Sequence, residues 1–226
     1  MEMEQKKYEF TGETMDFFGR TLHRIRSLRA FSDINIGDIG GWIEKEENLS
    51  HNNNAQVFDD AQVSGKAQVF GKAQVGGKAQ VGGDARVYNK AQVSDDAQVS
   101  GDALVGGEAQ VFDDAQVCGK AQVGGEAQVG GEAQVDGKAR VCGEARIFSN
   151  HHYWTSPRIG SRNDITTFYR SKDRRIMVVC GCCHTDIEDF ARRVKETHGD
   201  NQHARDYERA IQMAKIWIDL EGDIDE

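Results

Sequence analysis

The most varied set of polar side chains lies late in the chain, in the segment R-I-G-S-R-N-D-I-T-T (158–167). Ser161, Arg162 and Asp164 offer a hydroxyl, a planar cationic fork and a carboxylate, a set that can hold a phosphate together with a ribose or base edge. The alternative is a polar turn in which Arg162 pairs with a nearby carboxylate. The predicted ligand-binding residues are Arg158, Ser161, Arg162, Asn163, Asp164, Thr166 and Thr167.

A second cluster, C-G-C-C-H, follows closely; its members are Cys180, Cys182, Cys183 and His184. Zinc needs four well-placed ligands, usually from two separate pairs, so this single compact cluster favours structural thiols and predicts no metal site. A Cys–His nucleophile would pair Cys182 with His198 or His203, but no third residue that would orient the histidine is evident. We predict no catalytic residue here.

The elements that must position these clusters flank a repeat of six residues. Alanine recurs at every sixth position from 55 to 145, sixteen times, and valine follows two residues later, with Ile147 closing the series. Residues two apart in a strand share a face, so the alanine and valine of each unit point inward. The residue two after valine is glycine in eleven units and aspartate, asparagine or serine in the others. These residue types tolerate positive φ or favour turns, so each unit is predicted to be a short strand and a tight turn.

This pattern resembles the hexapeptide repeat of left-handed parallel β-helices, in which a small residue follows an aliphatic one four positions on. All fifteen consecutive valine–alanine pairs match it. Three units form one 18-residue coil in that family, which implies five and one third coils over 55–150. We predict an all-β core, a left-handed parallel β-helix of about five coils. A β cap (1–54) should precede it, and an α+β cap (151–226) should follow it.

Each open end of such a stack exposes unpaired strand edges, which the flanking segments should cover. In the N-terminal segment we expect strands with a turn near Gly19. We also expect Trp42 and Ile43 to plug the open end of the solenoid.

In the C-terminal segment we expect a β-hairpin followed by two helices. The hairpin should turn at S-K-D-R (171–174), between strands in 151–170 and 175–181. Thr185 and Glu188 form a capping box for the first helix, and Asn201 or Asp200 should cap the second. The predicted buried positions are Ile187, Phe190 and Val194 on the first helix and Ala204, Tyr207, Ile211, Ala214 and Ile218 on the second.

Aromatic residues stand among glycines at the outward position after valine. Such side chains on a flat face suit a partner surface. Because hexapeptide proteins are often trimers packed side by side, the resemblance implies a homo-oligomer, by analogy a trimer. The predicted contact residues are Phe58, Phe70, Tyr88, Phe112 and Phe148.

Many hexapeptide proteins are acyltransferases that use acetyl-CoA or acyl carrier protein and a histidine base, and this activity is one hypothesis. The seven histidines all lie outside the sixteen repeats, and no insertion breaks the period. His51, His151 and His152 at the ends would be the remaining bases. The absence of a histidine and of an insertion in the repeats therefore favours a protein that is not an enzyme and needs no cofactor. A purely structural or self-assembling rod is a third reading.

Composition restricts the setting. The net charge of −9 disfavours a broad DNA-binding face, and no apolar run is long enough to span a membrane. The start M-E-M-E-Q-K-K-Y-E-F lacks the apolar centre of a signal peptide. Five cysteines, an odd number, indicate reduced thiols, so we expect a cytoplasmic protein.

The ends also resemble uncharacterised hexapeptide proteins of bacteria and phages, a group labelled acetyltransferases on the repeat. The matching segments are G-W-I-E-K-E-E-N-L-S-H (41–51), I-G-S-R-N-D (159–164), T-T-F-Y (166–169), C-G-C (180–182), the run from Phe190 to H-G-D-N (198–201), and Tyr207. Phage origin would fit a counter-defence role. The leading hypothesis is a non-catalytic protein that binds a small anionic, nucleotide-like ligand, for example to sequester a signalling nucleotide.

Overall fold

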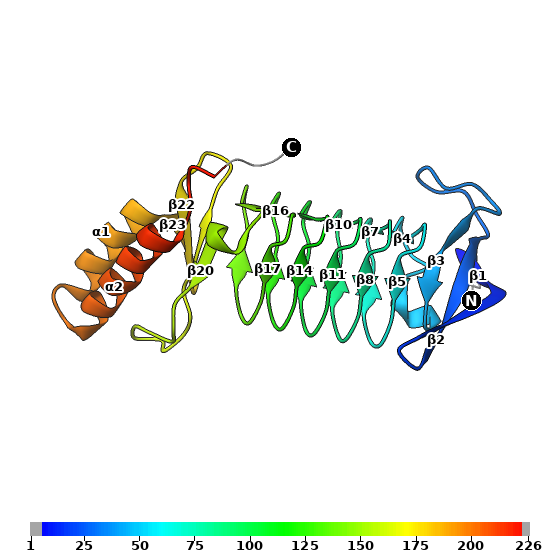
Figure 1. Ribbon diagram of the computed structural model, residues 1–226, viewed down its shortest axis with the longest axis horizontal. Coiled ribbons are helices and arrows are strands. Elements are labelled where there is room, and N and C mark those ends of the chain that lie inside the picture. The colour runs from blue at the N-terminus through cyan, green and yellow to red at the C-terminus, as the bar shows by residue number, and fades with distance from the viewer. Residues whose placement is uncertain (1–5, 223–226) are drawn as a thin grey trace.

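The computed structural model describes residues 6–222. It is an elongated rod, with a solenoid in the middle, a β-hairpin region at one end and a sheet with two helices at the other (Figure 1). The prediction that the start of the chain is not a signal peptide concerned residues 1–10. The first five of them lie outside the described residues. Within 6–222, no helix is both long and apolar enough to cross a membrane.

Between residues 56 and 147 the chain forms sixteen two-residue strands, one in each hexapeptide. They are β4 (Gln56–Val57), β5 (Gln62–Val63), β6 (Gln68–Val69), β7 (Gln74–Val75), β8 (Gln80–Val81), β9 (Arg86–Val87), β10 (Gln92–Val93), β11 (Gln98–Val99), β12 (Leu104–Val105), β13 (Gln110–Val111), β14 (Gln116–Val117), β15 (Gln122–Val123), β16 (Gln128–Val129), β17 (Gln134–Val135), β18 (Arg140–Val141) and β19 (Arg146–Ile147).

Each strand from β4 to β16 pairs in parallel with the strand 18 residues further on, as in the pairing of Gln92 with Gln110 and of Val93 with Val111. The pairings build three sheets, which contain β5-β8-β11-β14-β17, β4-β7-β10-β13-β16-β19 and β6-β9-β12-β15-β18. The predicted parallel β-helix with three strands per coil is therefore confirmed.

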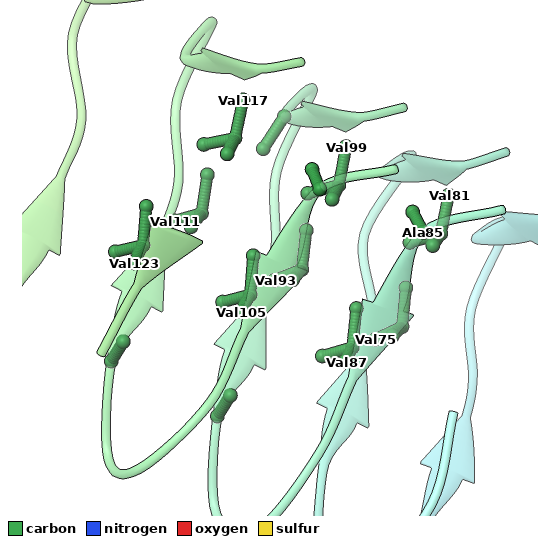
Figure 2. Packing of buried hydrophobic residues seen from close by; sticks show 14 of the residues in the cluster. Val75, Val81, Ala85, Val87, Val93, Val99, Val105, Val111, Val117 and Val123 are labelled. Atoms are coloured by element: carbon green, nitrogen blue, oxygen red, sulfur yellow. The ribbon is translucent and has the colours of Figure 1, made fainter. Parts of the chain in front are cut away.

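The core of the solenoid is made of the inward alanines and valines. All sixteen alanines and the fifteen valines with Ile147 are at most 2% exposed. Figure 2 shows valines of successive coils lying in a row along the solenoid axis, for example Val75, Val93 and Val111. Burying one such side chain contributes roughly 1.5–3 kcal/mol before the chain entropy is subtracted, and no single coil has a second layer to bury it against. Stacking is therefore the source of stability.

The turns lie where the sequence predicts them. Between residues 59 and 143, each residue two after a valine has positive φ, from Asp59 (52°) to Gly143 (64°). Ser149 is the exception in the series, because there the chain leaves the solenoid and the Ser149 hydroxyl caps η2 (Asn150–His152). Where aspartate replaces glycine, its carboxylate accepts a hydrogen bond from the next coil, as from Gly131 N to Asp113 Oδ2 (3.0 Å).

The outward aromatic rings lie over glycines of the next coil. A Cβ on Gly76 would lie 2.2 Å from Cζ of Phe58, and Gly106 and Gly130 meet Tyr88 and Phe112 in the same way. The rings therefore fill space that these glycines leave open. Phe70 stacks in addition on Tyr88, with 5.5 Å between ring centroids. The oligomer interface predicted for these rings stays a prediction.

The N-terminal segment consists of β1 (Tyr8–Phe17), β2 (Arg20–Ser27), β3 (Ile39–Ile43) and the short helix η1 (Glu46–Asn48). β1 and β2 form an antiparallel hairpin through Phe18 and Gly19, both at positive φ, so the turn predicted near Gly19 is confirmed. β2 pairs antiparallel with β3, and β3 pairs parallel with β5. Stacking thus begins before residue 55, and the solenoid has about six turns rather than about five.

The expectation that Trp42 and Ile43 jointly plug the solenoid is only half right. Ile43 pairs with Val63 in register and is fully buried, so it is the inward residue of an additional coil. Trp42 pairs with Gln62, an outward position, and the Arg24 guanidinium lies 4.9 Å from its ring centroid. The alternation of faces along a strand explains why neighbouring residues cannot both be plugs.

The C-terminal segment contains β20 (Tyr153–Thr155), β21 (Thr167–Arg170), β22 (Ile176–Cys180), β23 (Cys183–Asp186), α1 (Ile187–His198) and α2 (Gln202–Trp217). Over 153–186 the strands form an antiparallel sheet in the order β20-β21-β22-β23. The predicted hairpin is the β21–β22 pair. The single strand predicted over 151–170 is in fact two, β20 and β21, and β23 was not predicted.

The helix boundaries follow from their caps. The first helix is capped by Asp186, whose carboxylate accepts from Asp189 N; Thr185 was therefore the wrong cap, by one residue. Thr185 Oγ1 instead donates to the Asp189 carboxylate (2.8 Å). The predicted Asn201 cap of α2 is confirmed, with its side chain accepting from Ala204 N. All the predicted inward residues of both helices are buried.

The C-terminal sheet closes the solenoid with one face and carries the helices on the other. Tyr169 and Val179 belong to the solenoid core, whereas Phe168 and Val178 pack with α1 and α2. The last strand edges are also satisfied: Arg140 N donates to Thr167 Oγ1 (3.0 Å) and Gln134 N to Asn150 Oδ1 (2.8 Å). One face of the sheet therefore covers the end of the solenoid core, and the other face forms a second hydrophobic core with α1 and α2.

Two adjacent glycines test the stacking constraint. Gly125 has φ +66°, and a Cβ on it would lie 2.6 Å from Gly143 N, whereas a Cβ on Gly124 would meet no atom within 4 Å. We expect Gly125→Ala to lower the free energy of unfolding by at least about 1–2 kcal/mol, because alanine is strained at this φ and the coils approach closely. Gly124→Ala should change it by less than about 0.5 kcal/mol. Denaturant unfolding of both variants checks this; equal losses would contradict the account.

Candidate functional site

The polar segment predicted to bind a ligand is the loop between β20 and β21. It closes on itself: Ile159 N donates to Asp164 O (3.1 Å), and Asn163 N donates to Gly160 O (3.2 Å). The Asp164 carboxylate accepts from Ile165 N (2.9 Å). These bonds hold residues 159–164 as a compact turn, so its side chains are presented in a defined arrangement.

Two glycines allow this loop to lie against the helical layer. A Cβ on Gly160 would lie 2.0 Å from the Tyr207 hydroxyl of α2, and one on Gly181 would lie 2.5 Å from Nη1 of Arg162. Gly181 is in the turn between β22 and β23. The loop therefore contacts both the cysteine-rich turn and α2, segments that are distant in sequence.

A cavity of about 350 Å³ lies between the loop, the β22–β23 turn and the two helices. Its walls are of three kinds: aromatic and aliphatic side chains, two arginines, and small polar groups. The lining residues are Ser161, Arg162, Cys180, Cys182, Cys183, Phe190, Arg193, Val194, Thr197, His198 and Tyr207. Cavities of this size with an apolar lining and a few polar groups are typical of small-molecule sites.

The two arginines differ in how their charge is compensated. Arg193 Nε donates to Asp189 Oδ2 (2.6 Å), and hydrogen bonds from Thr185, Arg192 and Arg193 lower the pKa of Asp189 to about 2. Within residues 6–222, by contrast, no carboxylate lies within ion-pair distance of Arg162. The alternative of an Arg162 ion pair is therefore not what the described residues show, and Arg162 has its guanidinium available.

The aromatic wall is formed by Tyr207 and His198. Their rings are stacked, with 5.8 Å between centroids and 26° between planes. Burial, and then the contact with the Cys180 thiol at 3.6 Å, raises the pKa of Tyr207, so its hydroxyl stays protonated. This wall can receive a planar group, while Arg162 receives an anion.

The C-G-C-C-H cluster is divided by the sheet. Cys180, Cys182 and Cys183 line the cavity, but His184 turns to the solenoid side, where its Nε2 lies 2.7 Å from the Tyr169 hydroxyl. In residues 6–222, no group of three or more His, Cys, Asp or Glu side chains is placed to hold a metal ion.

The cavity also bears on the Cys–His hypothesis. Cys182 and His198 share it, whereas His203 contacts His198 edge-on, with 5.7 Å between centroids, and is not part of its wall. The described part of the chain contains no hydrogen bond between Cys182 and either ring. Cys182 and His198 therefore lie near each other, but they do not make the nucleophile–base contact that the hypothesis requires.

The predicted site residues fall into three groups. Ser161 and Arg162 line the cavity. Arg158, Asn163 and Asp164 are exposed on the same loop but do not line it. Thr166 and Thr167 are at most 1% exposed. Thr167 begins β21 and caps the solenoid, Thr166 immediately precedes that strand, and neither lines this cavity.

The contribution of α1 to the wall of the cavity was not predicted from the sequence. Arg193 and Thr197 lie one and two turns after Phe190, on the side that adjoins its buried face. The spacing of 190, 193 and 197 was a readable signal, because residues three, four and seven apart share one side of a helix. What it could not indicate was that the loop at 159–164 lies opposite.

Of the three histidines considered as acyltransferase bases, His151 is exposed with its ring centroid 5.0 Å from that of Trp217, and the other two are engaged at the ends of the solenoid. His152 is 4% exposed, with Nδ1 accepting from Phe148 N and Nε2 2.9 Å from Arg170 Nη1. His51 stacks on Tyr8 and accepts a hydrogen bond from Lys7 N. Neither lines the cavity described above.

His152 makes stability depend on pH. Burial, with the Arg170 charge, lowers its pKa from 6.5 to about 4. Between these values the unfolded chain binds a proton that the folded chain does not, so the free energy of unfolding should fall by about 2 kcal/mol from pH 7 to 4.5.

Urea unfolding of the protein and of His152→Gln at both pH values measures this contribution. The variant should lose the part of the pH dependence that His152 contributes, while His51, whose pKa burial also lowers, keeps a dependence of the same sign. Asp189 is no confounder, because its pKa lies near 2 and its titration falls below this window. An unchanged pH dependence in His152→Gln would show that other groups are responsible.

Comparison with known proteins supports the repeat. Residues 79–95 match the family model described as the YdcK β-solenoid repeat. The search of curated proteins found no match for the chain. The chain is therefore a repeat β-helix protein, similar over this segment to the YdcK solenoid.

Proposed function

We propose that this is a non-catalytic binding protein whose C-terminal cap holds a small anionic, nucleotide-like ligand. The observation that carries the proposal is the position of Arg162, a guanidinium that the described carboxylates leave unpaired, at a cavity of about 350 Å³. A planar fork of this kind binds phosphate through two parallel hydrogen bonds.

The remaining walls match the rest of such a ligand. A base or similar ring can pack against the Tyr207–His198 pair, and Ser161 and Thr197 offer hydroxyls for a sugar or phosphate. Arg193 adds positive charge, although Asp189 balances part of it. The volume suits one mononucleotide-sized molecule better than a long polymer.

The rigidity of the solenoid supports a binding role. Its inward residues are alanine and valine, and its turns are held by bonds between coils. A stiff scaffold holds the cap in one geometry, which reduces the ordering cost of binding. Sequestration of a signalling nucleotide, as in a phage counter-defence protein, is the biological setting we propose for this capacity.

The hexapeptide acyltransferase activity is the alternative proposal. It would need acyl-CoA and a base, and His152 is buried against Arg170 while His51 is packed on Tyr8. A self-assembling rod is a further alternative, but the described caps cover the strand edges through which coils would add.

Isothermal titration calorimetry with nucleoside monophosphates, cyclic dinucleotides and ADP-ribose tests the proposal. We expect one of these to bind, and Arg162→Ala to weaken it by about 10–100-fold, the value of a charge-assisted contact. Arg158→Ala is the matched control: it removes the same group from the same loop but from outside the cavity, so affinity should change by less than about threefold.

Two results would overturn the binding proposal. One is the absence of binding heat with every member of the panel, and the other is equal loss in the two arginine variants. Acetyl-CoA binding with thiol release in a colorimetric assay would favour the acyltransferase alternative, and filaments in electron micrographs would favour the rod.

A further inference from the structure

Cys180 and Cys183 face each other across the β22–β23 hairpin. The two strands pair in antiparallel register with Cys180 opposite Cys183, so only Gly181 and Cys182 lie between these two cysteines. Gly181 has φ +59°, as expected for the first central residue of the type II′ turn that often joins two antiparallel strands. The hairpin therefore holds the two cysteines at the pair of positions that closes the turn.

The two side chains also lie on the same side of the sheet. Directly opposite residues of an antiparallel pair share a face, and both cysteines pack against the core that includes α1 and α2. The next pair along the strands, Val179 and His184, lies on the other side, where Val179 joins the solenoid core and His184 contacts Tyr169. Cys180 and Cys183 thus belong to one surface, the wall of the cavity described above.

The spacing of such a pair suits a disulfide. Opposite Cα atoms in an antiparallel pair lie about 4.5 or 5.5 Å apart, and a disulfide requires roughly 4.4–6.8 Å. Burial raises the pKa of Cys183, which Arg193 lowers and the charge of Cys180 raises. The two cysteines are therefore close enough for the charge of one to affect the other. Both are free thiols and half-buried.

We propose that Cys180 and Cys183 form a reversible oxidation site, a dithiol that closes an internal disulfide by exchange with a low-molecular-weight disulfide, RSSR. The thiolate of one cysteine attacks RSSR, which forms a mixed disulfide and releases RS⁻. The thiolate of the other cysteine then attacks the sulfur of the first and releases the second RS⁻. Two electrons pass from the pair to RSSR, and the two thiol protons leave with it as two molecules of RSH.

The other cysteines of the chain lack this arrangement. Cys182 is exposed in the turn and has no residue opposite it in the strand pairing. Cys118 lies on the solenoid, where the positions 18 residues before and after it are Ser100 and Asp136. Cys142 likewise follows Gly124 by one coil. The stacked positions therefore offer neither solenoid cysteine a second thiol.

Closure of the disulfide should weaken ligand binding in the cavity, a consequence that rests on the proposed function. Cys180 Sγ lies 3.6 Å from the Tyr207 hydroxyl, and a Cβ on Gly181 would lie 2.5 Å from Nη1 of Arg162. A disulfide removes the thiol proton from the first contact and fixes the turn at the second. We expect the oxidised protein to bind about threefold to tenfold more weakly, the value of one neutral hydrogen bond.

Thiol counting on the ligand-free protein tests the disulfide. The protein is equilibrated with mixtures of reduced and oxidised glutathione, quenched with acid and alkylated, and its intact mass gives the number of free thiols. As the share of oxidised glutathione rises, we expect two of the five thiols to be lost to an internal bridge. Reduced glutathione in excess should restore them.

Serine variants assign the bridge. Cys182→Ser keeps the facing pair and should still form the bridge. Adding Cys183→Ser to that variant should leave glutathione on Cys180 as a mixed disulfide, because no second thiol can displace it. Cys118→Ser is the matched control on the solenoid and should oxidise as the unaltered protein does.

Three results would overturn the proposal. One is a Cys182→Ser protein that forms no internal bridge when oxidised glutathione is in excess, another is a bridge between two chains, and the third is a ligand that binds both states equally. Calorimetry on the reduced and oxidised protein separates this proposal from the proposed function. A panel that binds neither state counts against the ligand cavity, whereas the thiol count decides the disulfide without any ligand.

Discussion

The structure depends on one constraint: the backbone must return to the same position every 18 residues so that each coil can bond to the next. Gln92 N, for example, donates to Ala109 O at 2.9 Å, and the same bond recurs from coil to coil. This contact leaves room inside for only one alanine and one valine per strand. It also demands a left-handed backbone residue at each corner. A chain that obeys it becomes ordered without large apolar side chains, because coils rather than residues are the packing units.

The same regularity explains why the candidate site lies at the end of the solenoid. A uniform coil has flat faces, and its outward aromatic rings pack over glycines of the next coil. Where the period stops, unpaired edges must be covered, and the covering sheet acquires a second face. That face needs its own core, which α1 and α2 provide. The cavity beside Arg162 forms where the loop at 159–164 meets this added layer. The candidate site is thus a consequence of terminating the repeat.

Sequence alone predicted what depends on local pattern. The strands, the corners with positive φ, the hairpin at 171–174 and the inward faces of both helices follow from residue type and spacing, and the structure confirms them. The sequence did not predict the positions of residues that are set by tertiary contacts. Trp42 faces outward because β3 joins the parallel sheet in register, and Thr167 is used to cap the solenoid. Arg193 joins the site because the helical layer folds over a loop some thirty residues earlier in the chain, which no periodicity encodes.

The central claim is that recognition belongs to the cap and the solenoid serves as its support. A crystal structure of the protein soaked with a nucleotide that binds in solution tests this most directly. The account predicts density in the cavity between residues 159–164 and α1, with the phosphate on Arg162 and the ring against Tyr207 and His198. Density on a solenoid face or at the N-terminal end, with the cavity unchanged, would contradict it.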